Sequence, residues 1–453
     1  MTLRKQKPNE DFIPIVLSAD IGAYSMARSF AEEWSVRPVI LTCKQILGPI
    51  ANSRLFDVIV VKPNQITNPA SEYPLIDYLL ENVGELKNRY PGKKLVICPE
   101  ADSHVFGLAE NHEVLARNYL FQVPSVELLD ATNSKVAFAK IAEQNNIPCP
   151  TTIDFYLTDG LEHILELFVN SATAFPIVLK PAASYGYEGL KFPGKAKVYF
   201  IDNMEQLKKI LKLLIKETSG HPDANHFVIQ QRILGDDTYN FHVMCYANSE
   251  GKVAFSVSSH LLLEDHNPTA VGNPAALITE SFPNLTAPAI RFLEGLNWRG
   301  FANFDIKVDP QDGKAYFFEV NPRIGRSNYY STAAGMNPMR VFIDDLVYDR
   351  RYLVPTRQRK VLYSILPEPL VLLYTRGKLR RQVLKLVARR RTANPLSSPA
   401  EREFSLRYLR RWFYVTASTW KHVLKYHRYF PLSKARELGG GDYVPSSNLG
   451  KES

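Results

Sequence analysis

The strongest constraint on the fold is a pair of apolar segments with acidic residues inside them. Residues 301–309 read FANFDIKVD, and residues 315–323 read AYFFEVNPR. Alternation along a strand sends Asp305 to the face opposite its apolar neighbours, and it puts Glu319 and Asn321 on one shared face. Carboxylates and an amide that converge on one sheet face repel unless a cation lies between them. Mg²⁺ prefers oxygen ligands and often keeps substrate phosphates in its shell, so these segments predict a site for Mg²⁺ and a nucleotide.

The first 130 residues alternate apolar strands with helical segments. Residues 12–20 read as a buried strand, and residues 21–34 read as a helix that starts with small side chains. Glu10 and Asp11 interrupt the basic and apolar N-terminal run, so a strand is a better interpretation than a signal peptide. This alternation is typical of a parallel, Rossmann-like sheet. The region around Gly22 lacks a GxGxxG pattern and does not indicate a dinucleotide.

The middle of the chain adds strands rich in Val and Ile, at FPIVLKP and HFVIQQRI, with an amphipathic helix over 203–217 between them. No convincing Ser/His/Asp or Cys/His set for nucleophilic catalysis is visible. The four cysteines are scattered without a CxxC pair, which argues against a disulfide framework and a Cys-rich metal site and favours a reduced cytoplasm.

Four of these segments occur in a characteristic order: a strand that ends at Lys180, then QQRILGDD, FANFDIKVD and FFEVNPR. In this order and spacing the chain resembles the ATP-grasp ligases from about Asn133 to Val347. The resemblance implies two α+β lobes that hold ATP. It also implies a reaction in which a carboxylate becomes an acyl phosphate and is then joined to an amine, with ATP and Mg²⁺ as cofactors.

The resemblance also implies roles for particular residues. Contacts with ATP are implied for Lys135, Lys180, Ser184, Gln230, Gln231, Ile233 and Asp237. Asp305, Glu319 and Asn321 match the Mg²⁺ ligands, and Arg323 acts with Lys180 on the transferred phosphate. Two departures stand out: Gln230 stands where many members have an acidic residue, and the loop at 182–190 is poorer in glycine than the usual phosphate-covering loop.

A closer likeness links FIPIVLSADIGAYSMARSF, HLLLEDHNPTAVGNPAALIT and FEVNPRIGRSNYY to the D-aspartate ligases of Gram-positive bacteria. It implies that the β-carboxylate of D-aspartate is joined to the lysine side-chain amine of a peptidoglycan precursor, UDP-MurNAc-pentapeptide. Arg326 is then a candidate for a substrate carboxylate, because arginine pairs with carboxylates in a bidentate manner; a surface salt bridge is the alternative. Glu264 and Asp265 are candidates for the amine, or members of a solvated loop. Arg28 is a weaker candidate for a substrate anion.

The C-terminal part is strongly basic. Residues 351–453 hold 22 Lys and Arg against 6 Asp and Glu, a net charge of +16, and the whole chain carries +9. Three interpretations compete: contact with an anionic membrane face, help in holding the pyrophosphate of a UDP-linked substrate, or the solvated faces of packing helices. The cluster RRQVLKLVARRR favours the membrane. A nucleic-acid role is disfavoured, because no known nucleic-acid module is recognised there.

Together these observations predict an α/β and α+β protein of three parts. A Rossmann-like domain spans 1–130, an ATP-grasp domain of two lobes spans 131–348, and a basic, largely helical extension with a flexible tail spans 349–453. The expected location is the cytoplasm, at the inner membrane face. Two alternatives stay open: an ATP-grasp ligase for another amino acid and amine, and a non-catalytic, membrane-associated ATP-binding module.

Overall fold

The computed structural model describes most of the 453-residue chain. The described residues are 11–46, 48–133, 135–182, 187, 190–196, 198–221, 224–267, 272–351, 358–402, 405–437 and 439–445. Contacts divide the chain into two compact units. Unit 1 comprises Met1–Leu129, Gly235–Asp305 and Asn321–Ser453, and unit 2 comprises Asp130–Leu234 and Ile306–Val320. The division into three sequence domains stays a prediction, because these units group distant segments by contact.

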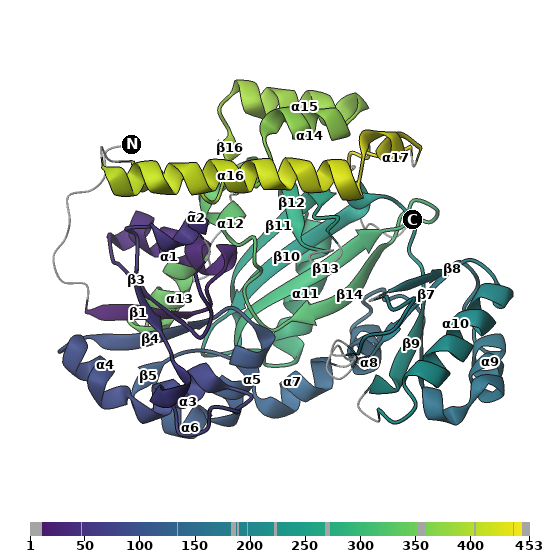
Figure 1. Cartoon of the computed structure of the whole chain (residues 1–453), viewed down its shortest axis with the longest axis horizontal. Coiled ribbons are helices and arrows are strands. Elements are labelled where there is room, and N and C mark those ends of the chain that lie inside the picture. Colours follow the sequence, from purple (N-terminus) through teal and green to yellow (C-terminus); the bar gives the residue numbers. More distant parts are fainter. Residues whose placement is uncertain are drawn as a thin grey trace. The chain divides into compact units, whose positions relative to one another are not determined.

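A five-stranded parallel sheet opens unit 1, as the alternation of strands and helices predicts. Its strand order is β3-β2-β1-β4-β5 (Figure 1). The strands are β1 (Phe12–Leu17), β2 (Val39–Thr42), β3 (Asp57–Val60), β4 (Lys94–Pro99) and β5 (Tyr119–Leu120). One face packs on a helical layer formed by α3 (Pro74–Glu81), α4 (Val83–Arg89), α5 (Asp102–Glu110) and α6 (His112–Leu115).

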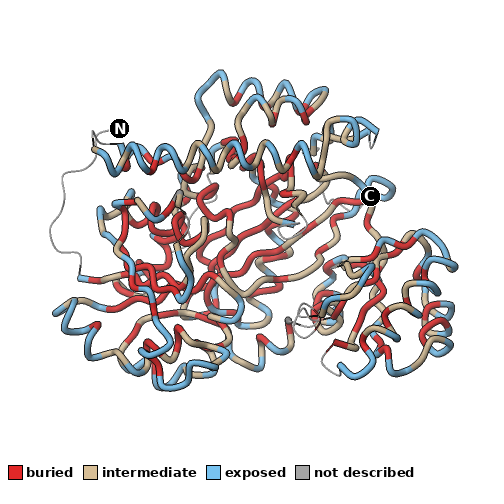
Figure 2. Tube along the Cα trace, in the orientation of Figure 1, coloured by how far each residue is buried: buried red, intermediate tan, exposed pale blue. Residues whose placement is uncertain are grey.

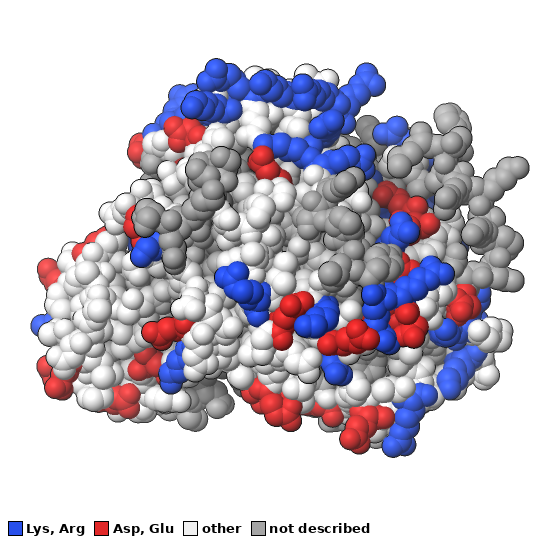
Figure 3. Space-filling view, turned by 180° about the vertical axis from the view of Figure 1, so that it is seen from behind, with Lys and Arg blue, Asp and Glu red and all other residues white. Residues whose placement is uncertain are grey.

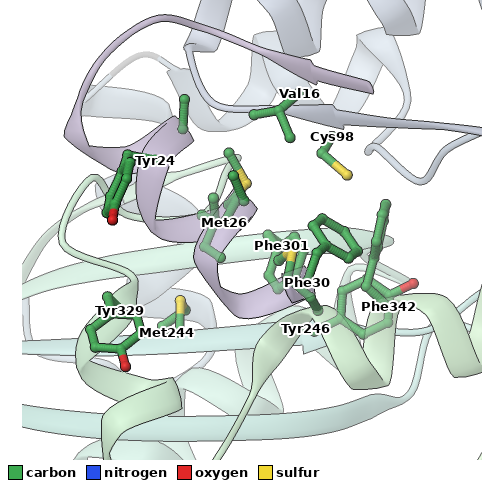
Figure 4. Packing of buried hydrophobic residues seen from close by; sticks show 14 of the residues in the cluster. Val16, Tyr24, Met26, Phe30, Cys98, Met244, Tyr246, Phe301, Tyr329 and Phe342 are labelled. Atoms are coloured by element: carbon green, nitrogen blue, oxygen red, sulfur yellow. The ribbon is translucent and has the colours of Figure 1, made fainter. Parts of the chain in front are cut away.

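Helix α1 (Ile21–Trp34) covers the other face and is buried nearly all round. Nine consecutive residues, from Gly22 to Phe30, are buried, as expected for a helix that lies between two layers. Figure 4 shows its side chains between those of β1 and β4 and those of the larger sheet of unit 1. Asp20 caps its first turn by accepting hydrogen bonds from the backbone N–H groups of Gly22 (2.7 Å) and Ala23 (3.3 Å).

That larger sheet has seven strands in the order β14-β13-β10-β11-β12-β15-β16. Its longer strands are β10 (Asn240–Ala247), β11 (Val253–Glu264), β12 (Pro274–Thr279), β13 (Gly300–Val308) and the edge strand β14 (Ala315–Asn321). Helices α11 (Pro283–Gly295), α12 (Tyr329–Ala333) and α13 (Pro338–Leu346) follow its strands. Figure 2 shows the central strands almost wholly buried. Both strands with internal carboxylates therefore belong to one sheet, as predicted.

Unit 2 is built on a four-stranded antiparallel sheet with the order β6-β9-β7-β8. Its strands are β6 (Thr152–Tyr156), β7 (Ile177–Pro181), β8 (Tyr199–Ile201) and β9 (His226–Gln231). Helices α9 (Leu161–Asn170) and α10 (Met204–Glu217) bury their apolar stripes against one face. Helix α8 (Lys135–Gln144) also lies in this unit, after α7 (Val126–Asn133).

The C-terminal region is more than a helical extension. Its short strands β15 (Leu362–Ser364) and β16 (Thr392–Ala393) add to the seven-stranded sheet, β15 antiparallel to β12 and β16 parallel to β15. The helices are α14 (Glu368–Tyr374), α15 (Gly377–Ala388), α16 (Leu406–Tyr429) and α17 (Leu432–Glu437). Among the described residues, no helix combines the length and hydropathy needed to cross a membrane.

Candidate active site

The carboxylate of Asp305 lies at the centre of a polar cluster on the seven-stranded sheet. Its two oxygens accept hydrogen bonds from His242 Nδ1 (2.8 Å) and Asn321 Nδ2 (3.1 Å), and Asn303 Nδ2 lies 3.4 Å away. These side chains come from β10, β13 and β14. Glu319 precedes Asn321 by two residues and is half-buried on the same face of β14. The structure thus brings Asp305 and Asn321 together, as the alternation predicts.

His242 is the member of this cluster that sequence reasoning missed. It lies in the apolar strand NFHVMCYA, and its polar role becomes apparent only from its contact with Asp305 on β13. Its side chain is buried, and its Nε2 atom has no hydrogen-bond partner among the described residues.

The donor set here suits a hard cation. Asp305, Asn321 and Glu319 offer oxygen atoms, which Mg²⁺ prefers. Across the described residues, no group of three or more His, Cys, Asp or Glu side chains is arranged as a metal site. Oxygen atoms of these side chains could share the shell of such an ion with phosphate and water, as happens with Mg²⁺ in nucleotide sites.

A second cluster, called here the acid–arginine cluster, lies where β1 and β4 end. It consists of Asp20, Glu100, Asp102, Arg323 and Arg326. Arg323 Nε donates to Asp102 Oδ1 and Arg326 Nε donates to Asp20 Oδ2, both at 2.9 Å. Because β1 and β4 are adjacent and parallel, their carboxyl ends meet at one edge, which is where open α/β sheets bind ligands.

Glu100 is the buried acid of this cluster. It is 7% exposed, and a Cβ atom on Gly22 would lie 2.3 Å from its Oε1, so any larger residue at position 22 would require the Glu100 carboxylate to shift. Burial, and then the charge of Asp20, raises the pKa of Glu100 to about 8. Burial disfavours the charge of Arg323, but Asp102, Glu100 and Asp305 outweigh that effect and raise its pKa.

Two candidate nucleotide residues of unit 2, Lys180 and Gln230, share one face of the four-stranded sheet. Gln230 pairs with Val178 across β7 and β9, and Lys180 lies two residues from Val178. Side chains that are opposite or two apart in an antiparallel pair point to the same side, so Lys180 and Gln230 lie on one face. The helices α9 and α10 cover the other face.

Gln230 and Lys135 have hydrogen-bond partners in the protein and also carry groups that could bind a base and a phosphate. Gln230 Nε2 donates to Thr152 Oγ1 at 2.9 Å, while its buried Oε1 has no partner among the described residues. An unpaired buried oxygen is costly, and the amino group of adenine would satisfy it. Lys135 Nζ donates to the carbonyl oxygen of Ala182 at 3.1 Å, just after β7. Gln231 is half-buried and Ile233 buried, and Ser184 lies outside the described residues.

The remaining candidates have protein partners. Asp237 Oδ2 accepts from the backbone N–H of Glu264 and from His266 Nε2, both at 2.9 Å. Glu264 Oε1 accepts from Asn240 at 2.8 Å. Asp265 is 5% exposed, and its carboxylate accepts from the backbone N–H of Asn267. Because Asp265 is buried, the solvated-loop interpretation does not hold for it.

Arg28 is buried on α1. Its Nε donates to Glu32 at 2.7 Å, its Nη1 donates to the carbonyl oxygens of Asn394 and Pro395 at 2.9 Å each, and its guanidinium lies 3.7 Å from the ring centre of Tyr329. Its role as a substrate contact stays a prediction.

Comparisons with known proteins agree with this geometry. Residues 134–340 match the family described as carbamoyl-phosphate synthase L chain, ATP binding domain. The D-aspartate ligase of Enterococcus faecium is 27% identical over 390 residues, which cover 83% of this chain and 89% of that protein. Both matches support an ATP-dependent, ADP-forming ligase of the ATP-grasp kind.

Solved structures show the same fold at low sequence identity. The biotin carboxylase domain of the Hydrogenobacter thermophilus 2-oxoglutarate carboxylase, solved with MgADP and bicarbonate, has a TM-score of 0.55 and 13% identity, covering 78% of this chain and 73% of that chain. Biotin carboxylase from Campylobacter jejuni has a TM-score of 0.53 and 16% identity, covering 77% and 74%. These likenesses confirm the predicted fold class.

Proposed function

We propose that this ligase activates the β-carboxylate of D-aspartate and joins it to the lysine side-chain amine of UDP-MurNAc-pentapeptide, a peptidoglycan precursor. The observation that carries the proposal is the match to a D-aspartate ligase along 83% of the chain. The match extends well beyond the 134–340 segment of the ATP-binding family, so it takes in more of the chain than the nucleotide-binding core.

The first step places two anions against each other. A carboxylate oxygen attacks the γ-phosphorus of ATP, ADP leaves, and an acyl phosphate forms. Lys180 and Arg323 are proposed to neutralise the charge on the transferred phosphoryl group, and preorganised cations do so with little reorganisation. Asp305, Glu319 and Asn321 would hold Mg²⁺, which would further screen the phosphate oxygens. Gln230, Gln231 and Ile233 are assigned to adenine, with Lys135, Ser184 and Asp237 as further nucleotide contacts.

The second step joins the two substrates. The amine nitrogen attacks the acyl carbon, phosphate leaves, and the nitrogen loses a proton. The acid–arginine cluster suits a substrate that carries both charges: Arg323 and Arg326 can receive carboxylates, while Asp20 and Asp102 can receive an ammonium. Arg28, Glu264 and Asp265 are further candidates for substrate contacts, and each also has protein partners.

The proposal is tested by the mass of the product. Purified protein with ATP and Mg²⁺ is given D-aspartate, L-aspartate or other amino acids, each with the UDP-linked pentapeptide. The expected result is a precursor heavier by one aspartyl residue with D-aspartate only. A product from another pair would keep the ligase and replace its substrates. No product with any pair would support a non-catalytic nucleotide-binding module.

We also propose that α16 rests on an anionic membrane face, which would place the enzyme at the cytoplasmic side of the membrane. With 3.6 residues per turn, five large apolar residues fall within about 60° of one another on this helix. They are Leu406, Leu409, Phe413, Trp420 and Leu424, and they are 58–84% exposed. The opposite side of the helix carries the buried Arg411 and Tyr426.

Basic side chains flank this apolar stripe, which gives it the chemistry of an interfacial helix. They are Arg407, Arg410, Lys421, Lys425 and Arg428. Figure 3 shows Lys and Arg gathered along the upper edge, where the C-terminal helices lie. Charge complementarity therefore points to anionic lipid, and an uncharged bilayer would be a poor match.

A further inference from the structure

The C-terminal region builds a cavity of about 640 Å³ within unit 1, at some distance along the chain from the nucleotide residues. It is called here the arginine cavity. Its walls come from α1, α12, β15, β16 and the segment 394–402. The volume falls within the range of small-molecule sites, which is roughly 300–1,000 Å³.

Five arginines line this cavity: Arg28, Arg359, Arg390, Arg391 and Arg402. Arg28 is buried and occupied, because it braces the carbonyl oxygens of Asn394 and Pro395. The other four are exposed, and their side chains make no hydrogen bond or ion pair with the residues that the structure describes. Glu368 is the one carboxylate among the described lining residues. The cavity therefore has a strong excess of positive charge.

Backbone hydrogen bonds hold these arginines in place. The N–H of Arg391 donates to Leu386 and its carbonyl oxygen accepts from Leu362, both at 2.9 Å. The N–H of Arg359 donates to Ala334 at 2.9 Å. Arg390 has a φ of 52°, a left-handed conformation that favours glycine, and it still carries an arginine side chain. The charges are thus presented by ordered backbone and do not sit on a mobile tail.

Arginine forks match phosphate geometry, and four of them exceed what a single carboxylate requires. We propose that the arginine cavity binds a diphosphate group, with a ligand the size of a nucleoside diphosphate. Building on the proposed function, we assign it to the phosphate end of the amine-bearing substrate. Tyr329 connects the two sites, because it lines the cavity and follows Arg326 by three residues on one segment.

The same assignment divides the basic cluster RRQVLKLVARRR, which covers most of α15 and the residues just after it. Arg390 and Arg391 face the cavity, whereas Arg380 and Arg381 lie on exposed positions of α15 outside it. This division supplies a matched pair of variants with equal loss of charge: Arg391→Gln with Arg402→Gln, and Arg380→Gln with Arg381→Gln.

The test is calorimetric titration with UDP, with the nucleotide site first filled by saturating MgADP. Wild type and the R380Q/R381Q variant should bind UDP alike and bind uridine far more weakly. The R391Q/R402Q variant should lose about tenfold or more in UDP affinity, because charge-assisted hydrogen bonds to phosphate are lost. Its affinity for MgADP and its circular dichroism spectrum should be unchanged.

Equal UDP affinity in all three proteins would overturn the proposal. So would a cavity variant that loses binding to phosphatidylglycerol vesicles and keeps UDP, because the ligand would then be a lipid headgroup. UDP binding is measured without turnover, so a wrong D-aspartate assignment would leave this result intact. Conversely, if the cavity does not bind UDP, the dependence of ATP consumption on an amino acid can still be measured separately.

Discussion

The acid–arginine cluster and the arginine cavity both contain arginines, but in different electrostatic settings. In the cluster, Arg323 and Arg326 each have a carboxylate partner at 2.9 Å. In the cavity, four arginines have no such partner among the described residues. Paired arginines are held in a fixed geometry and suit a site where a phosphoryl group moves. Arginines without a carboxylate partner can pair with an incoming anion, which suits tight binding.

A third setting, in which an arginine and its carboxylate partner are both buried, predicts the largest effect on stability. Arg411 Nε lies 3.3 Å from Glu401 Oε1, and both side chains are about 4% exposed. Tyr24 also donates to Glu401, at 3.2 Å. Glu401→Gln should lower the free energy of unfolding by about 3 kcal/mol or more, because it leaves Arg411 buried without a countercharge. Urea unfolding measures this. A loss below about 1 kcal/mol would contradict it, and Glu437→Gln on exposed α17 is the control.

The paired arginines predict the largest effect on activity. Arg323→Gln should reduce the turnover of amino-acid-dependent phosphate release by about 100-fold or more, as expected when a preorganised cation is removed from the transition state. The fold should survive, because Arg323 is partly exposed. Arg351→Gln, which breaks an ion pair with Glu250 of similar length, is the matched control and should retain wild-type turnover. Equal rates in both variants would remove Arg323 from the site.

Helix α16 carries a third group of basic residues, which lie on an exposed surface beside an apolar stripe. Replacing Phe413, Trp420 and Leu424 together with Ser should weaken sedimentation with phosphatidylglycerol vesicles about tenfold, because the apolar stripe is lost while the charges remain. Val169→Ser, on an equally exposed apolar residue of α9, should not change sedimentation. Unchanged sedimentation of the triple variant, or equal binding to uncharged vesicles, would rule out the anionic membrane contact.

The buried acid of the cluster predicts an effect of pH on stability. The pKa of Glu100 is about 8 in the folded chain, above its usual 4.5. Between these values the folded protein binds the proton and the unfolded chain does not. The free energy of unfolding therefore falls as pH rises from 4.5 to 8, by up to about 1 kcal/mol per pH unit. Glu100→Gln should flatten that slope in urea unfolding, and Glu113→Gln should not. A retained slope would show that Glu100 is ionised in the fold.

Much of the fold follows from local pattern. The helix over 21–34 and the carboxylate-bearing strands are where alternation and helical spacing place them. The strands β15 and β16 were not predicted, because three and two residues are too few to show alternation, and the pairing of β15 with β12 and of β16 with β15 depends on distant residues.

The candidate site was predictable in part for the same reason. Periodicity reports the face on which Asp305 and Asn321 lie, but it does not report partners from other strands. His242 reaches Asp305 from 63 residues away in the chain, and Asp102 reaches Arg323 from 221 residues away. Such pairs are products of the tertiary fold, so neither His242 nor the acids at the end of β4 could be named from the sequence.

The most direct test of the account is phosphate release from ATP and Mg²⁺ by the purified chain, with each substrate alone and with both together. The account predicts release that requires both D-aspartate and the lysine-containing precursor, is absent with L-aspartate, and is sharply reduced in Glu319→Gln. Release that is independent of any amino acid, or a Glu319→Gln variant as fast as wild type, would contradict the assignment of this site to acyl-phosphate chemistry.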